Sequence, residues 1–227
     1  LNLFILPFRP KKSAAAYRKV WTSRGSPLLC NSLDLAAAVG DRLGANWLVR
    51  IGMAYGSPSI PSAIDDLLAA GCTRLVVLPL YPQNASSSTG AAVQAVCAAL
   101  AHRQSPPPLC VLEPFYDDPG FLSVLAAHGR DVIAREKPDH VLFSFHGLPE
   151  RQIRKNDDEQ RLQARIPQGS SPAAPHCLAS ESCCATVTDR NRTCYRAQSF
   201  ATARLLAQHL GLATDGYSVS FQSRLGR

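Results

Sequence analysis

The chain has 227 residues, of which 46% are hydrophobic and 18% are charged, a balance typical of a globular protein with a core of its own. Its formal net charge of +7 favours anionic partners, but the basic residues form only short clusters, which argues against nucleic acid as a partner. No uncharged stretch reaches the ~18 apolar residues of a membrane span, and the apolar start has neither the basic region nor the cleavage site of a signal peptide.

Short apolar runs alternate along the chain with segments that show helical periodicity. In chain order we expect strands at 47–53, 74–80, 109–113, 140–145 and 217–221, and helices at 33–43, 59–70, 89–102, 120–136 and 196–210. This alternation is typical of a parallel sheet with helices on both of its faces. The sequence therefore predicts a doubly wound α/β fold, in which ligands bind at the carboxyl ends of the strands.

Two segments interrupt the alternation. The first, at 113–119, combines two prolines with two aspartates, and we interpret it as the boundary between domains at 1–118 and 119–227. The second, at 158–175, is rich in proline, glycine and serine and has no apolar periodicity, so we expect an exposed loop there.

A histidine follows one of the expected strands directly. His146 comes after the apolar run at 140–145 and before Gly147, a residue suited to a turn. A neutral imidazole at the carboxyl end of a strand can ligate a metal ion or accept a proton near neutral pH. From position alone, a structural histidine bonded to the turn is an equal alternative.

The eight cysteines fall into two groups. The first group is spaced singly among apolar residues or element boundaries, where free cysteine packs as a small hydrophobe: Cys30, Cys72, Cys97 and Cys110. The second group is crowded into one short segment: Cys177, Cys183, Cys184 and Cys194. Because we expect no export signal, we interpret such a cluster as a metal or iron–sulfur site before disulfides. Four thiolates suit a zinc ion or a [2Fe–2S] cluster, and the adjacent pair lacks the two-residue gap of zinc knuckles. Unligated or disulfide-bonded cysteines are the remaining alternative.

The string Ser-Phe-His-Gly-Leu-Pro at 144–149 resembles the signature of ferrochelatases. Further segments resemble that family in the same order and spacing, at 9–28, 53–56, 78–90 and 217–226. The resemblance implies two similar doubly wound domains, Rossmann-like or flavodoxin-like, with a porphyrin cleft between them and both incomplete in this chain. It also implies a lyase that inserts its substrate Fe2+ into protoporphyrin IX or coproporphyrin III in haem biosynthesis.

The resemblance assigns roles to individual residues. His146 would be the active-site histidine, which ligates the incoming iron or accepts pyrrole protons. Tyr17 and Ser26 match positions near the bound porphyrin, and their alternatives are a half-buried helix aromatic and a turn serine. The segment at 176–194 resembles an insertion with which some bacterial members hold a [2Fe–2S] cluster, so Cys177, Cys183, Cys184 and Cys194 would be its ligands, in a structural or sensing role.

The chain departs from the family at both ends. The family's metal-site glutamate would follow Arg227, and the first strand would precede Leu1, so we expect a truncated piece whose activity alone is in doubt. A cobalt chelatase of the same fold, and a non-catalytic iron–sulfur or haem-binding sensor, are the competing functions. We expect a cytoplasmic protein, and its positive charge and apolar substrate are compatible with peripheral contact with the inner membrane.

Overall fold

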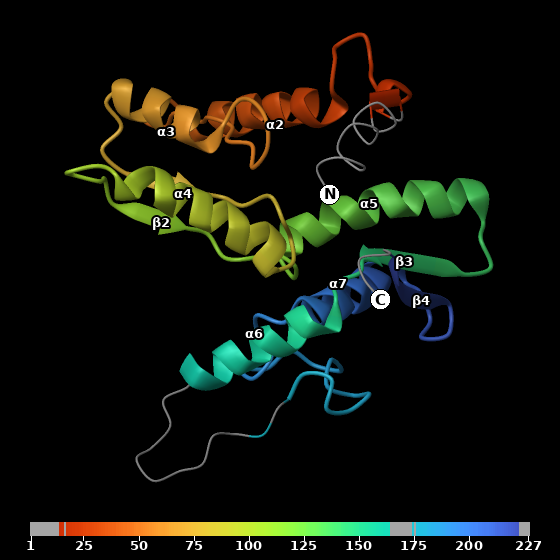
Figure 1. Cartoon of the computed structure of the whole chain (residues 1–227). Helices are drawn as coiled ribbons and strands as arrows, with labels where there is room; N and C mark the ends of the chain where they lie inside the picture. Colours follow the sequence, from red (N-terminus) through yellow and green to blue (C-terminus); the bar gives the residue numbers. More distant parts are fainter. Residues whose placement is uncertain (1–13, 16, 164–173, 175, 223–227) are drawn as a thin grey trace. The chain divides into compact units, whose positions relative to one another are not determined.

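The computed structural model describes residues 14, 15, 17–163, 174 and 176–222, and helices alternate with strands along them (Figure 1). The elements are, in chain order, α2 (Pro27–Leu43), α3 (Ile60–Ala69), β1 (Leu75–Val77), the π-helical turn η1 (Ser86–Gly90), α4 (Ala91–Ala101), β2 (Leu109–Val111), α5 (Pro119–Glu136), β3 (Val141–His146), α6 (Glu150–Gln163), α7 (Tyr195–Leu210) and β4 (Tyr217–Gln222). The described residues divide into two compact units, drawn from Leu1–Leu75 with Ala95–Pro108 and from Val76–Gln94 with Leu109–Arg227. The domain limits expected at 1–118 and 119–227 stay a prediction.

Side-chain caps and turn residues set several helix ends. The Ser26 hydroxyl accepts a hydrogen bond from the Leu29 N–H at 3.5 Å, and the Asp118 carboxylate accepts one from the Phe121 N–H at 2.8 Å. Each cap is followed by a proline, which suits the first helical turn of α2 and α5. At the carboxyl end of α7, Gly211 adopts φ 68°, a left-handed conformation that glycine takes without strain. Among the residues described, no helix combines the length and the apolar composition that crossing a bilayer requires.

Strands β1 and β2 form a two-stranded sheet. The Leu75 N–H donates to the Pro108 carbonyl at 2.9 Å, and the Leu112 N–H donates to the Val77 carbonyl at 2.9 Å. The partners advance along both strands in the same direction, so the pair is parallel.

Strands β3 and β4 form a second parallel pair, in register from Val141 opposite Tyr217 to His146 opposite Gln222. Helix α7 packs on β4, where the rings of Phe200 and Phe221 lie 5.6 Å apart between centroids. Helix α5 packs on α7 in turn. These contacts confirm the parallel α/β class, whereas the doubly wound, two-domain form with a cleft stays a prediction.

Small residues let α5 and α7 approach closely. A Cβ atom added at Gly129 of α5 would lie 3.1 Å from Leu210 Cδ2 of α7. Ala126 and Ala203, one on each helix, are fully buried. Side chains of this size bring the helix backbones together and exclude water from the seam between them.

The strand expected at 47–53 is wrong for the described residues. The segment forms no regular strand, and its pairing is limited to an isolated bridge between Met53 and Ser59. Its largest apolar side chains, those of Trp47 and Leu48, are exposed, so the apolar run does not mark a buried strand. A Cβ atom at Gly52 would lie 2.9 Å from Ile60 Cγ1, so glycine is needed where this segment meets α3.

Helix α6 was not predicted, because its sequence is polar almost throughout and lacks apolar periodicity. Ile153 and Asp157, four residues apart, are the buried positions among residues 150–158 of α6, the part of the helix whose side chains are described. The loop expected at 158–175 is wrong for 158–163, which continue α6. Residues 164–173 and 175 lie outside the described part of the chain.

Candidate functional site

His146 is the last residue of β3, at the carboxyl edge of the β3–β4 pair. Its side chain is exposed, and the next residue, Gly147, donates its N–H to the Gln222 carbonyl at 2.8 Å. The backbone around the histidine is therefore fixed by β4, while the imidazole stays accessible. This is the edge at which parallel α/β sheets bind ligands. The predicted position at the end of a strand is confirmed, and the role of the imidazole stays a prediction.

Tyr195, the first residue of α7, supports this strand end. Its ring lies 6.4 Å from the Phe221 ring between centroids. Burial raises the pKa of Tyr195, and contacts of its hydroxyl with the Ser199 side chain and the His146 backbone N–H oppose that rise. The residue directly after Cys194 therefore packs against the strand pair that carries the candidate histidine. Sequence reasoning missed Tyr195, because nothing in its local pattern distinguishes it from a core aromatic.

The loop after β1 reaches the same region of the second unit. Gln83 Nε2 donates to Thr202 Oγ1 at 3.0 Å. Asn84 donates its backbone N–H to Gln198 Oε1 at 2.6 Å and its side-chain amide to the Thr193 carbonyl at 2.9 Å. The cavity between these segments has a volume of about 20 Å³, enough for one water molecule and far too small for a porphyrin.

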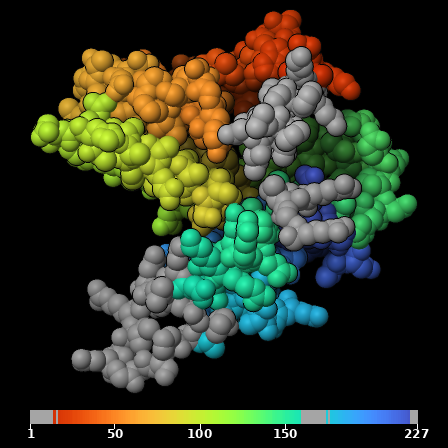
Figure 2. All heavy atoms as spheres, viewed as in Figure 1, coloured from red at the N-terminus to blue at the C-terminus, as the bar shows by residue number. Residues whose placement is uncertain are grey.

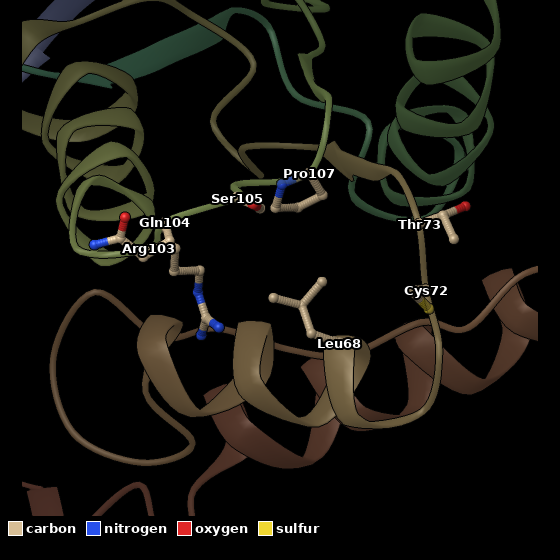
Figure 3. Close-up of a pocket in the computed structure, with 7 residues that line it drawn as sticks. All are labelled: Leu68, Cys72, Thr73, Arg103, Gln104, Ser105 and Pro107. Carbon is tan, nitrogen blue, oxygen red and sulfur yellow. The ribbon is translucent and has the colours of Figure 1, made fainter.

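A larger pocket of about 650 Å³ lies in the first unit. Its lining residues are Leu68, Cys72, Thr73, Arg103, Gln104, Ser105 and Pro107 (Figure 3). Thr73 and Pro107 precede β1 and β2, so the pocket lies at the amino ends of these strands, opposite the edge where this class of sheet binds ligands. The Arg103 guanidinium pairs with Asp65. None of the predicted site residues lines this pocket.

Tyr17 and Ser26 belong to the first unit, and His146 belongs to the second. Tyr17 is 62% exposed, and its ring meets the Trp21 ring edge-on at 6.3 Å between centroids. The Ser26 hydroxyl caps α2 through the Leu29 N–H. Their contact with a porphyrin stays a prediction.

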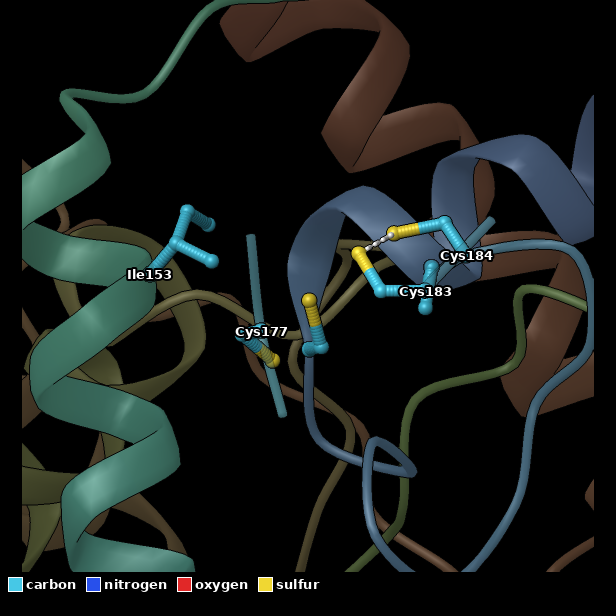
Figure 4. Close-up of a cluster of buried hydrophobic side chains, with 6 residues drawn as sticks. Ile153, Cys177, Cys183 and Cys184 are labelled. Atoms are coloured by element: carbon cyan, nitrogen blue, oxygen red, sulfur yellow. Dashed lines mark hydrogen bonds between the residues drawn. The ribbon is translucent and has the colours of Figure 1, made fainter. Parts of the chain in front are cut away.

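The four clustered cysteines are free thiols that the structure buries together with Ile153 and Ala197: Cys177, Cys183, Cys184 and Cys194. None of the four is more than 7% exposed. The sulfur atoms of Cys183 and Cys184 lie 3.6 Å apart and are turned toward each other (Figure 4).

The thiols are linked through Cys194. A hydrogen bond from Cys194 lowers the pKa of Cys177, against the opposing effect of burial. Donating that bond is the main reason that the pKa of Cys194 is raised to about 11. The bond from Cys184 to Cys194, followed by burial, raises the pKa of Cys184 well above its usual range. The thiols of Cys184 and Cys194 are therefore held protonated when no metal is bound, and a metal would have to displace their protons.

Helix α6 fixes the start of the cysteine segment. The Asp157 carboxylate, which is 2% exposed, accepts the N–H groups of His176 at 2.8 Å and Cys177 at 3.2 Å. Figure 2 shows α6 at the surface, directly against the light-blue segment that carries the cysteines. The polar helix that sequence reasoning missed therefore supplies the anchor for the first cysteine.

Asn191 fixes the middle of the segment. Its Oδ1 accepts the Thr188 N–H at 2.7 Å, and its Nδ2 donates to the carbonyls of Cys183 and Thr186, both at 2.9 Å. With every polar atom of its side chain bonded, the buried Asn191 holds the turn that presents Cys183. In the sequence, only the place of Asn191 between two of the clustered cysteines points to this role, and that is a weak signal.

The donor chemistry of this cluster fits an iron–sulfur group, since it brings four buried thiols together. Within the described residues, no group of three or more His, Cys, Asp and Glu side chains is arranged to hold a metal ion. A [2Fe–2S] cluster requires two pairs of ligands, because each of its two irons takes two protein ligands. The spacing of Cys183 and Cys184 is close to the about 3.8 Å that separates two thiolates on one tetrahedral metal with bonds of about 2.3 Å.

Comparison with known proteins covers the whole chain. A sequence model described as ferrochelatase matches residues 1–227. The ferrochelatase of Coxiella burnetii (strain CbuG_Q212) is 38% identical over 227 residues, which are 100% of this chain and 59% of that protein. The ferrochelatase of Legionella pneumophila (strain Corby) is 38% identical over 223 residues, 98% of this chain and 61% of that protein. The chain thus spans about 60% of the length of these curated relatives. It belongs to the ferrochelatase family.

Proposed function

We propose that the protein containing this chain is a ferrochelatase, which inserts Fe2+ into protoporphyrin IX or coproporphyrin III in haem biosynthesis. The observation that carries the proposal is the exposed imidazole of His146 at the carboxyl edge of a parallel strand pair. The family match along residues 1–227 supports it. The organisation into domains at 1–118 and 119–227, with a porphyrin cleft between them, is part of the same proposal.

The chemistry requires a base and a transient metal ligand. Metallation replaces two pyrrole N–H protons with a divalent cation, and neutral imidazole accepts protons and binds such cations. His146 takes this role, because its side chain is accessible while β4 fixes its backbone. Tyr17 and Ser26 contact the porphyrin, and binding energy along the macrocycle is available to bend it toward a reactive shape.

The four clustered cysteines hold a [2Fe–2S] cluster in this proposal: Cys177, Cys183, Cys184 and Cys194. Their common burial and the 3.6 Å separation of the Cys183 and Cys184 sulfurs support it. The cluster has a structural role, since its loop is bonded to α6 through Asp157 and to the β1 loop through Thr193. When bound, it would supply a redox-active centre.

The cluster is tested by visible absorbance and iron content of protein purified without oxygen. Cys183→Ser should abolish the absorbance, whereas Cys97→Ser, which changes an exposed thiol, should retain it. Absorbance that survives in Cys183→Ser would remove that residue from the ligand set.

We place the protein in the cytoplasm, in peripheral contact with the inner membrane. The net charge of +7 and the exposed rings of Tyr17 and Trp21 support that location.

The activity is tested by metal insertion into a free porphyrin, followed by the change in porphyrin absorbance under anaerobic conditions. The assay is run on the 227-residue chain and on the product of the whole reading frame that contains it, with Fe2+ and with Co2+ in parallel. Insertion of Fe2+ by either product, faster than insertion of Co2+, supports the proposal. Porphyrin binding without insertion of iron by either product would favour a sensor, and a clear preference for cobalt would favour a cobalt chelatase.

A further inference from the structure

We propose that Arg196 is a positioning residue that sets the reduction potential of the cysteine-held cluster by donating hydrogen bonds to the sulfurs of Cys183 and Cys184. The inference rests on the [2Fe–2S] cluster of the proposed function. It concerns the side chain of Arg196, to which neither the family match nor the pattern of the four clustered cysteines assigns a role.

The guanidinium of Arg196 is aimed at the adjacent pair of thiols. Its Nη1 lies 3.1 Å from Cys184 Sγ and 3.7 Å from Cys183 Sγ. The central carbon of the same group lies 4.8 Å from the centroid of the Phe200 ring, a stacking contact that limits its movement. Arg196 is half-buried at the second position of α7, so the backbone that carries it is also fixed.

The opposite end of the cluster has the opposite charge beside it. The buried carboxylate of Asp157 accepts the Cys177 N–H at 3.2 Å. A cation thus lies against the sulfurs of Cys183 and Cys184, while an anion lies behind Cys177. This asymmetry is a property of the thiols' surroundings and holds whichever metal they bind.

Reduction adds one electron, and so one negative charge, to a group already held by four thiolates. Hydrogen bonds to the sulfurs and a nearby cation stabilise that added charge, and they do so more strongly in a buried site than in water. The electron comes from an external one-electron reductant, and no bond to a protein atom is made or broken. Arg196 therefore raises the reduction potential of the cluster.

Three variants separate the contact with sulfur from a general effect of charge. Arg196→Gln removes the cation at the sulfurs, and Arg196→Lys keeps a charge without the planar donor. Arg204→Gln is the matched control, because Arg204 lies on the same helix and donates to the Cys184 carbonyl at 3.2 Å rather than to a sulfur. All are purified anaerobically and titrated with dithionite, with the visible absorbance and the paramagnetic resonance of the reduced cluster as readouts.

We expect Arg196→Gln to lower the equilibrium constant for one-electron reduction about tenfold, which is about 59 mV in midpoint potential. Arg204→Gln should change it less than twofold, and Arg196→Lys should fall between the two. Equal potentials in Arg196→Gln and the wild type would overturn the inference, as would an equally large change in Arg204→Gln.

The controls also separate this inference from the proposed cluster. A wild-type protein without visible absorbance would contradict the cluster, and the role of Arg196 with it. Normal absorbance with an unchanged potential in Arg196→Gln would contradict the role of Arg196 alone. Loss of the absorbance in Arg196→Gln, with the absorbance kept in Arg196→Lys and Arg204→Gln, contradicts the inference, because Arg196 would then be needed to hold the cluster rather than to set its potential. Loss in all three variants contradicts it, because any change in that helix would then be enough.

Discussion

The side-chain amide of Asn84 donates to the carbonyl oxygen of Thr193 at 2.9 Å, which joins the loop after β1 to the residue directly before Cys194. Asn156 of α6 donates to the same carbonyl at 3.3 Å. Two segments far apart in the sequence therefore meet at the backbone that presents the last cysteine. Hydrogen bonds thus join the loop after β1, helix α6 and the cysteine segment, so a substitution in one of these segments should change the stability of the other two.

Gln198→Leu should lower the free energy of unfolding by about 1–3 kcal/mol, because it leaves buried polar groups without partners. Gln198 accepts the Asn84 N–H at 2.6 Å and donates to the Arg192 carbonyl at 2.6 Å. Urea denaturation measures the change. Gln208→Leu, at an exposed position of the same helix, should stay within about 0.5 kcal/mol of the wild type. Equal effects of the two substitutions would contradict the importance of this junction.

Asp157→Ala should reduce the iron content of the protein and weaken its visible absorbance. The substitution removes the acceptor that holds the His176 and Cys177 N–H groups, and so frees the start of the cysteine segment. Asp189→Ala, at an exposed position of the same unit, serves as the control and should keep its iron. Full iron content in Asp157→Ala would show that Cys177 needs no anchor from α6.

The pair of Arg24 and Asp34 should respond to acid. Two hydrogen bonds, of 2.7 Å and 2.9 Å, join the guanidinium to the carboxylate, and they hold the pKa of Asp34 below its ordinary value of 3.8. A carboxylate with a lowered pKa in the folded state contributes stability above its unfolded pKa and loses it as the pH falls through the folded value. Arg24→Ala should therefore raise the pKa of Asp34 in an NMR titration. An unchanged pKa would mean that the pair does not persist in solution.

The sequence predicted the elements whose pattern matches their surroundings. The helix expected at 120–136 is α5, and the strand expected at 140–145 is β3, which continues to His146. Apolar periodicity succeeds there because each element buries one face in its own unit. The sequence missed α6, because Ile153 and Asp157 are the buried positions among its residues 150–158, and a single buried apolar residue creates no period.

The candidate site was predictable in its ligating residues but not in the residues that support them. Cysteines crowded between 177 and 194 indicate a cluster without any structure, and the structure buries all four together. Asp157, Asn191 and Arg196 are ordinary polar residues in sequence, and their roles arise only from distances across α6, the loop and α7. The strand expected at 47–53 failed for a related reason, because an apolar run does not show what it packs against.

The most direct test compares the rates at which His146→Ala and His140→Ala insert Fe2+ into a porphyrin. Each substitution is made in the product, the 227-residue chain or the whole reading frame, whose wild type inserts iron. His140 is a matched control, since it precedes the same strand at its other end, is exposed, and bonds to Ser218 Oγ at 3.0 Å. We predict that His146→Ala loses about 10²- to 10⁴-fold in insertion rate and still binds porphyrin, while His140→Ala inserts iron at the wild-type rate. Wild-type insertion by His146→Ala would contradict the assignment of the reaction to the edge of β3.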